Sequence, residues 1–246
     1  MALLSGLVWL AGAGQGWAAD SGLAQKTYWE SREHFKQQPQ NLETAWQFGR
    51  ACFDLAEFAT NSTERAELAE QGIAACKEAV ARASKSAPAH YYLAMNQGQL
   101  ARTRSLGALK LVDEMEREFS KAGELDAHFD YAGPDRNLGY LYRDAPSFGS
   151  IGSRSKARQH FERAVALAPE YPENHLALLE AFMKWGDRNG AVRTLKDLEG
   201  VWPAARQQFS GPAWAASWAD WEARLDKEKQ KLEARSKALE SPRGRQ

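Results

Sequence analysis

The stretch SKARQHFERAVALAPEYPENHLALLEAFMKWGDRNGAVRTLKDLEGVWP (residues 155–203) contains one pattern of small, large and proline residues twice. The two copies lie 34 residues apart and consist of Ala157, Phe161, Ala164 and Pro169, then Ala191, Leu195, Leu198 and Pro203. A repeat of this length is typical of a helix-turn-helix unit. Small residues let the two helices approach, and large residues fill the space beside them. The proline that closes each copy predicts the end of the second helix.

A first-helix signature recurs upstream of this stretch. It is Leu138, Gly139 and Tyr142 in a Leu-Gly-x-x-Tyr element, with looser matches at Phe48, Gly49 and Cys52 and at Leu93 and Ala94. On these residues the chain resembles the tetratricopeptide repeat (TPR) family, with four units in residues 41–203. Gly49, Ala94 and Gly139 recur every 45 residues, so the first three units are about eleven residues longer than the TPR period. The resemblance implies an all-α fold, a TPR-like solenoid of helical hairpins with N- and C-terminal capping helices.

The composition agrees with a helical protein. Strong helix formers dominate, and no run of alternating β-branched residues predicts a strand. The 246 residues include 32 Lys and Arg against 32 Asp and Glu, so the chain has no global basic field. We therefore expect no nucleic-acid partner.

Both ends of the array are predicted to be capped, because a terminal repeat has an apolar face without a neighbour. The N-terminal cap is predicted over residues 20–40, with Tyr28, Trp29 and Phe35 on it. The C-terminal cap is predicted over residues 204–240. Its Trp214, Trp218, Trp221 and Leu225 form one helical stripe, which we expect to cover the fourth unit rather than bind a partner. Residues 241–246 are predicted to be a disordered tail.

Residues 1–19 are predicted to be a signal peptide. LLSGLVWLAGAG (3–14) is uncharged and apolar, and GWAAD (16–20) offers small residues for cleavage after Ala18 or Ala19. The segment is too short to span a bilayer comfortably, so no transmembrane segment is expected in the mature chain. No cysteine near the cleavage site suits a lipid anchor. These features predict a periplasmic or secreted protein, and a buried N-terminal helix is the alternative.

The two cysteines, Cys52 and Cys76, lie on the two helices of the first unit. The TPR resemblance places both positions toward the same core, at a separation that suits a disulfide. An oxidising compartment favours the bridge. Two thiols packed as small apolar residues are the alternative, and both interpretations stay open at this point.

The segment GSIGSRSK (149–156) raises the question of a phosphate site, because glycine- and serine-rich loops at helix starts bind anions. It lacks the order of a Walker A motif, and no strand precedes it. It lies between the two helices of the third unit, so we interpret it as a loop with Ser153 as the helix N-cap. A weaker anion contact through Arg154 and Lys156 is the alternative.

The sequence contains no catalytic or metal-binding motif. The five histidines lie in different segments, without a carboxylate at metal-ligand spacing. The sequence has neither a Gly-x-Ser-x-Gly nucleophile elbow nor a cysteine in the sequence context of a catalytic Cys-His pair. We therefore predict no metal, no cofactor and no enzymatic activity.

The TPR resemblance implies a binding surface on the concave face, which the first helix of each unit lines. Carried over unit by unit, the face comprises Trp46, Arg50, Phe53, Tyr91, Met95, Gln99, Arg136, Tyr140, Arg143, Leu176, Glu180 and Met183. Aromatic, Met and Arg side chains of this kind suit interface hot spots. The lysine and asparagine of chaperone-binding TPR domains are not matched, because Trp46 and Arg50 stand at those positions.

These observations predict a non-catalytic, exported TPR scaffold that binds a protein or peptide. One alternative is a periplasmic small-molecule-binding accessory protein of a transporter, with Phe119, Phe129, Tyr131 and Phe148 around an apolar pocket. It rests on a looser similarity, through the SIGSRSKAR loop and the Trp-rich C-terminus, to the TPR component associated with some TRAP-type transporters. The other alternative is an intracellular TPR scaffold, should the N-terminus not be a signal peptide.

Overall fold

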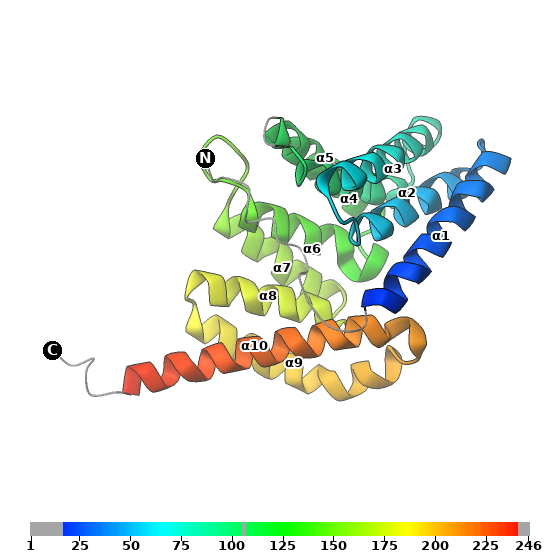
Figure 1. Cartoon of the computed structure of the whole chain (residues 1–246). Coiled ribbons are helices and arrows are strands. Elements are labelled where there is room, and N and C mark those ends of the chain that lie inside the picture. Colours follow the sequence, from blue (N-terminus) through cyan, green and yellow to red (C-terminus); the bar gives the residue numbers. More distant parts are fainter. Residues whose placement is uncertain (1–16, 105–106, 241–246) are drawn as a thin grey trace. The chain divides into compact units, whose positions relative to one another are not determined.

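The computed structural model describes residues 17–104 and 107–240 (Figure 1). The described residues form helices joined by turns and contain no strand, which confirms the predicted all-α class. They make two compact parts, divided between His160 and Phe161. Residues 1–16 of the predicted signal peptide and the predicted tail, 241–246, lie outside the described residues.

Within residues 17–104 and 107–240, four helical hairpins follow the first helix. The bounds are α1 (Trp17–Gln37), α2 (Leu42–Ala56) with α3 (Ser62–Arg82), α4 (Ala87–Ala101) with α5 (Ala108–Leu125), α6 (Phe129–Asp144) with α7 (Arg154–Leu167), and α8 (Pro172–Trp185) with α9 (Arg188–Gln208). A 3-10 turn, η1 (Pro212–Trp214), leads into α10 (Ala215–Glu240). In the N-terminal part α1 packs on α2, and α4 packs on both helices of the first hairpin. In this part the first helices of successive hairpins therefore lie side by side, α2 next to α4 and α4 next to α6.

Local capping explains where several helices begin. The side chains of Asn41, Asn61, Ser86 and Asp187 accept hydrogen bonds from backbone N–H groups in the first turns of α2, α3, α4 and α9. These residue types are preferred N-caps because their oxygen satisfies an N–H group that has no partner within the helix. At α3 the Glu64 carboxylate also accepts from the N–H of Thr60, the residue before the N-cap, at 2.9 Å.

Small residues bring the helices of the first hairpin together, as the repeat pattern predicts. A Cβ atom at Gly49 would lie 2.2 Å from the Cys76 sulfur, so only glycine fits there. Gly72 makes the same kind of room for the buried Asn96. The Asn96 amide then donates to the Gly49 carbonyl oxygen at 2.8 Å, which ties α4 to α2.

Cys52 and Cys76 are free thiols in this structure, so the disulfide, one of the two interpretations that the sequence leaves open, is not formed in it. Both side chains are buried, and burial raises the pKa of both thiols. The Cys76 sulfur fills the space that Gly49 leaves open. The two residues therefore pack as small apolar side chains.

The proline signal at the end of the fourth repeat was misleading. Pro203 was expected to end the second helix, but α9 continues through it to Gln208, and the final helix begins only at Ala215. Proline lacks one hydrogen-bond donor, yet here it lies on the exposed side of α9. Ala205 and Phe209 beyond it are buried, so continued packing compensates for the lost bond.

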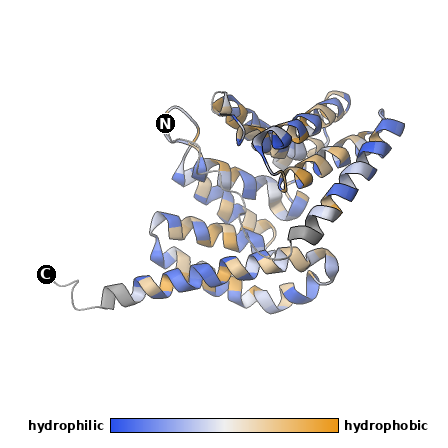
Figure 2. Ribbon diagram, viewed as in Figure 1, coloured by the Kyte–Doolittle hydropathy of each residue, from blue (hydrophilic) through white to orange (hydrophobic). Residues whose placement is uncertain are grey.

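The tryptophan stripe of α10 is part of a buried core in the C-terminal part. Trp218, Trp221 and Leu225 are buried, and α10 packs against α8. Hydrophilic and hydrophobic residues alternate along α10 (Figure 2), as expected for a helix with one packed side. The stripe is therefore not a free binding surface.

Candidate functional site

The N-terminal part contains most of the predicted concave face, on α2, α4 and α6. We call this side of the three helices the helix-A face. Trp46, Phe53 and Met95 are half-buried there, and Arg50 is exposed. Tyr91, Gln99, Arg136 and Tyr140 are buried, and the Arg143 guanidinium is held by the adjacent Asp144 and lies over the Tyr140 ring. The structure thus divides the predicted face into accessible and internal residues.

Gln99 and Arg136 were wrongly predicted to face a partner. The Gln99 amide donates to the Glu57 carboxylate and accepts from Arg65 at 2.8 Å, so it joins helices of neighbouring hairpins. Arg136 is committed to the Asp130 carboxylate at 2.9 Å. The spacing of residues in the sequence predicts the side of a helix on which a residue lies. It does not predict which polar side chains from other helices will bind that residue.

In the C-terminal part the predicted face is covered by the chain itself. Leu176 and Met183 are buried. The Glu180 carboxylate accepts from Arg224 of α10 at 2.8 Å. These three residues of α8 are therefore packed against the capping helix and do not form an open surface, contrary to the prediction.

Aromatic rings form a shelf on the helix-A face. Trp46 stacks on Tyr92 with ring centroids 5.9 Å apart and an interplanar angle of 7°. Phe129 meets the edges of Tyr91 and Tyr92 at 5.2 and 6.2 Å. Sequence reasoning had missed Tyr92 as part of the face, although its neighbour Tyr91 was selected. The shelf joins all three helices.

A left-handed turn opens α6 beside this shelf. Asp130, Tyr131 and Ala132 have φ values of 51°, 54° and 60°, a region that residues with a Cβ atom rarely adopt. The Arg136 guanidinium donates to the carbonyl oxygens of Asp130 and Tyr131, at 3.2 and 3.1 Å. Backbone strain of this kind persists only where its surroundings over-determine it, and it is found frequently at functional sites.

The Asp130 carboxylate is the centre of a partly buried hydrogen-bond network. It accepts from the Tyr91 hydroxyl at 2.6 Å and from Arg136 at 2.9 Å. The Asn137 amide in turn donates to the Tyr91 oxygen at 2.8 Å. Burial raises the pKa of Tyr91, and Asp130 adds to the rise, so the phenol keeps its proton and remains a donor.

Asp54 is the one carboxyl group of this face with a large pKa shift that the structure describes. Burial among the surrounding side chains raises its pKa to about 6, against the opposing effect of Arg50, and Asp130 and Glu57 add to the rise. The nearest cation is the Arg50 Nε atom, 3.5 Å away. Since 40 % of the Asp54 side chain is exposed, solvent screens part of the unfavourable environment.

We expect Asp54 to make the protein more stable as the pH falls. Its folded-state pKa of about 6 exceeds the ordinary value of 3.8, so the native state binds the proton more tightly. Stability should rise as the pH falls through about 6 and level off below about 4. After allowance for solvent, the gain should be about 1 kcal/mol.

The measurement is urea unfolding of the wild type and of Asp54→Asn across this pH range. The variant should be more stable near neutral pH, and the difference should vanish in acid. A difference that does not change with pH would contradict this origin.

The loop 149–156 is structural in the described chain. Ser153 caps α7 by accepting from the Lys156 N–H at 3.3 Å, as predicted. The Lys156 ammonium lies over the Tyr142 ring and 3.9 Å from Glu116, and Arg154 also has a partner. Arg154 and Lys156 therefore do not form a free anion site.

Gly152→Ala is expected to destabilise this loop by about 1–3 kcal/mol, the usual range for overpacking. A Cβ atom at residue 152 would lie 2.1 Å from the Ala145 carbonyl oxygen, a backbone atom that cannot rotate away. The matched control is Gly200→Ala in α9, where the added atom meets open space and helix propensity favours alanine. Thermal unfolding should separate the two variants, and equal effects would refute the steric argument.

The histidines that the structure describes in the core have structural partners. The ring of His90 is hydrogen-bonded to Glu118 at 2.5 Å, and the ring of His160 is hydrogen-bonded to Asp135 at 2.8 Å. The ring of His175 is hydrogen-bonded to the Pro169 carbonyl oxygen at 2.7 Å. Among the described residues, no group of three His, Cys, Asp or Glu side chains could hold a metal ion. No described helix combines the length and apolar character needed to cross a membrane.

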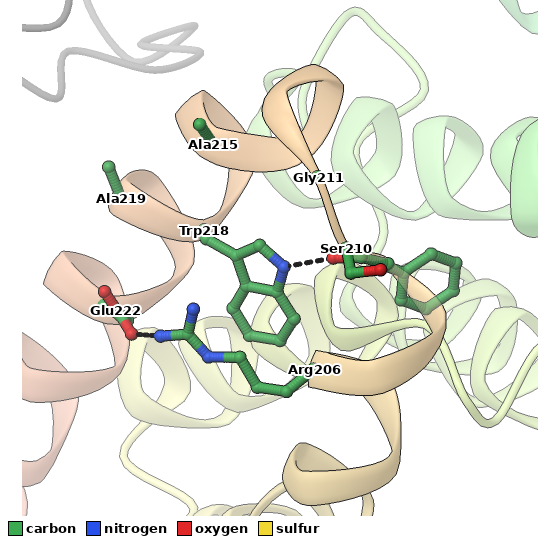
Figure 3. Close-up of a pocket in the computed structure, with 8 residues that line it drawn as sticks. Arg206, Ser210, Gly211, Ala215, Trp218, Ala219 and Glu222 are labelled. Atoms are coloured by element: carbon green, nitrogen blue, oxygen red, sulfur yellow. Dashed lines mark hydrogen bonds and ion pairs between the residues drawn. The ribbon is translucent and has the colours of Figure 1, made fainter.

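The C-terminal part contains an open cavity of about 360 Å³ between the end of α9 and the start of α10 (Figure 3). The Arg206 guanidinium lies 4.1 Å from the centre of the Trp218 ring and is paired with Glu222. The Trp218 indole N–H donates to the Phe209 carbonyl at 2.5 Å. These polar groups bind one another, so the cavity presents little free hydrogen-bonding capacity.

The comparisons with known proteins establish the fold. A structure of TTC0263, a thermophilic TPR protein in Thermus thermophilus, is similar over 87 % of this chain and 93 % of that chain, with 18 % identity and a TM-score of 0.62. The chain has a TPR fold. One structure of MamA covers 76 % of this chain and 92 % of its own, with 19 % identity and a TM-score of 0.53. A second structure of MamA covers 79 % of this chain and 98 % of its own, with 16 % identity and a TM-score of 0.51.

At the level of sequence, one family model matches part of the TPR chain. It is described as RMD1-3, Regulator of microtubule dynamics protein 1-3, and it matches residues 11–130. No curated protein matches the sequence. The region matched by the family model includes α2 and α4, two of the three helices that carry the helix-A face.

Proposed function

We propose that the protein is an exported, non-catalytic scaffold that binds a segment of another protein on its helix-A face. The observation that carries the proposal is the accessible strip formed by Trp46, Arg50, Phe53 and Met95 beside the aromatic shelf. Aromatic and Arg side chains are among the residue types that dominate the energetics of protein interfaces. The TPR fold supports this proposal, because such arrays bind partners along the first helices of their repeats.

Site-specific photo-crosslinking tests the binding surface. A photoreactive amino acid replaces Phe53 on α2, and in a control protein it replaces Leu109, an exposed apolar residue of α5 in the same part. We expect a protein adduct from position 53 and none from position 109. Equal adducts at both positions, or none at position 53, would overturn the proposal.

Export is supported by the apolar N-terminal segment and by the small residues at the predicted cleavage site. The mass of the intact protein, recovered from each compartment of an expressing bacterium, tests it. A periplasmic product that begins near Asp20 is the expected result. A full-length cytoplasmic product would overturn export and leave an intracellular scaffold.

The family match favours a second candidate function within the intracellular alternative. Its printed description concerns regulators of microtubule dynamics, and its residues include most of the helix-A face. Co-sedimentation with polymerised tubulin tests this candidate directly. Binding that is lost in Arg50→Ala would support it, and the absence of binding would remove it.

The small-molecule alternative loses its predicted pocket. Phe119 is buried in the core, whereas the Phe148 side chain is 96 % exposed. Phe119 and Phe129 both pack against the Tyr91 ring, and the exposed Phe148 does not complete a pocket with them. The transporter link stays a prediction without a site in the described residues.

A further inference from the structure

Arg50 differs from the other arginines predicted for the helix-A face. Its side chain is 58 % exposed, while Arg136 and Arg143 are mostly buried and bound to Asp130 and Asp144. The one ion pair of Arg50 within the described residues runs from its Nε atom to Asp54 at 3.5 Å. Its two terminal nitrogens make no hydrogen bond there, so one edge of the guanidinium remains open.

The other carboxylates that act on Arg50 or on its partner Asp54 are bound by other groups. Asp130 accepts from Tyr91 and Arg136, and Glu57 is paired with Arg102 at 3.2 Å. Arg50 therefore shares its charge with Asp54 alone at close range. A guanidinium has five donors in a planar fork and can hold a second carboxylate on its free edge.

The Arg50 guanidinium lies over the ring of Tyr92 on one side. The Arg50 Cζ atom lies 5.9 Å from the ring centre, and Trp46 stacks on the same ring. A carboxylate at the free edge would therefore lie next to an aromatic surface. Such a pairing suits an acidic residue that has an apolar neighbour in its own chain.

The fourth hairpin contains an ion pair at the matching register. In the TPR alignment of the repeats, Glu180 of α8 takes the place of Arg50 in α2. Glu180 is bound by Arg224 of α10, which also bonds Glu173 at 2.7 Å. In the fourth hairpin the charge at this position is therefore neutralised by Arg224 of the same chain. The free edge of the Arg50 guanidinium can instead bind a carboxylate from another protein.

We infer that Arg50 receives an aspartate or glutamate side chain from an acidic, partly apolar segment of the partner protein. The inference rests on the proposed function and names the chemistry of the partner. A chain-terminal carboxylate has the same chemistry, and the experiment distinguishes the two sources. Asp54 competes for Arg50, so it should weaken binding while it is ionised.

The experiment measures fluorescence anisotropy of labelled synthetic peptides with the full-length protein. One peptide alternates Glu with Phe and Ala and has an amidated C-terminus, a second has a free C-terminus, and a third carries Lys in place of Glu. We expect the amidated acidic peptide to bind and the Lys peptide not to bind. Arg50→Ala should weaken the acidic peptide at least about tenfold, the usual effect of losing a charged hydrogen bond.

Two further variants sharpen the test. Asp54→Asn should strengthen binding of the acidic peptide, because it removes the competing carboxylate. Arg117→Ala, which removes an exposed arginine of α5, should leave the affinity unchanged. Circular dichroism confirms that each variant is folded.

Several results would overturn the inference. The first is that Arg50→Ala binds the amidated acidic peptide as tightly as the wild type does, and the second is a preference for the Lys peptide. The third is that only the peptide with a free C-terminus binds, and the fourth is that no peptide binds. A photo-adduct at position 53 that persists alongside any of these results would show that the scaffold proposal stands without this partner chemistry. If position 53 gives no photo-adduct and no peptide binds, the scaffold proposal and the inference about Arg50 are both wrong.

Discussion

Trp221→Ala is expected to lower the free energy of unfolding of the C-terminal part by about 3–5 kcal/mol, the range for truncating a large buried aromatic residue. The Trp221 side chain is 2 % exposed. Its ring meets those of Tyr171 and Trp218 at 5.4 and 4.9 Å, and its indole N–H donates to Glu173 at 2.9 Å. Because repeats depend on their neighbours, the loss should appear first in α8 and α10.

Urea unfolding followed by circular dichroism measures the loss, and amide hydrogen exchange shows where it occurs. Trp29→Ala on α1 is the matched control, since that ring is half-exposed. It should change stability by less than about 1 kcal/mol. Trp221→Phe keeps most of the ring contacts and should fall between the two. A Trp221→Ala effect no larger than that of Trp29→Ala would contradict the buried-core role.

Arg136→Ala is expected to destabilise the N-terminal part by about 3 kcal/mol, the lower end of the range for removing one partner of a buried ion pair. The lower end applies because Asp130 keeps about a third of its side-chain surface exposed. Arg136 also bonds the carbonyl oxygens of the turn at Asp130 and Tyr131. Without it, two of the three consecutive left-handed residues lose the bonds to Arg136, at a strain of about 1 kcal/mol or more each.

Thermal and urea unfolding of Arg136→Ala, Arg136→Lys and the control Arg117→Ala test this expectation. Lysine keeps the charge but lacks the planar fork, so it should recover only part of the loss. The control should behave as the wild type. If lysine restores full stability, charge alone matters, and the proposed bonding of the turn is wrong.

Much of the fold followed from local sequence. The 34-residue period, the Leu-Gly-x-x-Tyr element and the tryptophan stripe predicted helical hairpins, close helix contacts at Gly49 and a buried final helix. These features depend on which side of a helix is apolar or small, and that property repeats along the chain. Pro203 misled because later apolar residues kept α9 packed beyond it.

The candidate site was only partly predictable. Sequence spacing placed Trp46, Arg50 and Phe53 on one side of α2, and they are accessible there. It also selected Gln99, Glu180 and Met183, which the structure assigns to internal contacts. The reason is that their partners, Glu57, Arg224 and Arg235, lie more than forty residues away in the sequence.

By itself, then, the sequence determined the class of the fold, the repeat and the helices that carry the helix-A face. Only the tertiary structure decided which charges on that face are free. Asp130 and Arg136 pair beside a left-handed turn whose three residues are neither glycine nor asparagine. Arg50 keeps an open edge because the neighbouring carboxylate of Asp130 is already paired. Apolar periodicity is a local property, whereas the pairing of polar groups is settled by which helices meet.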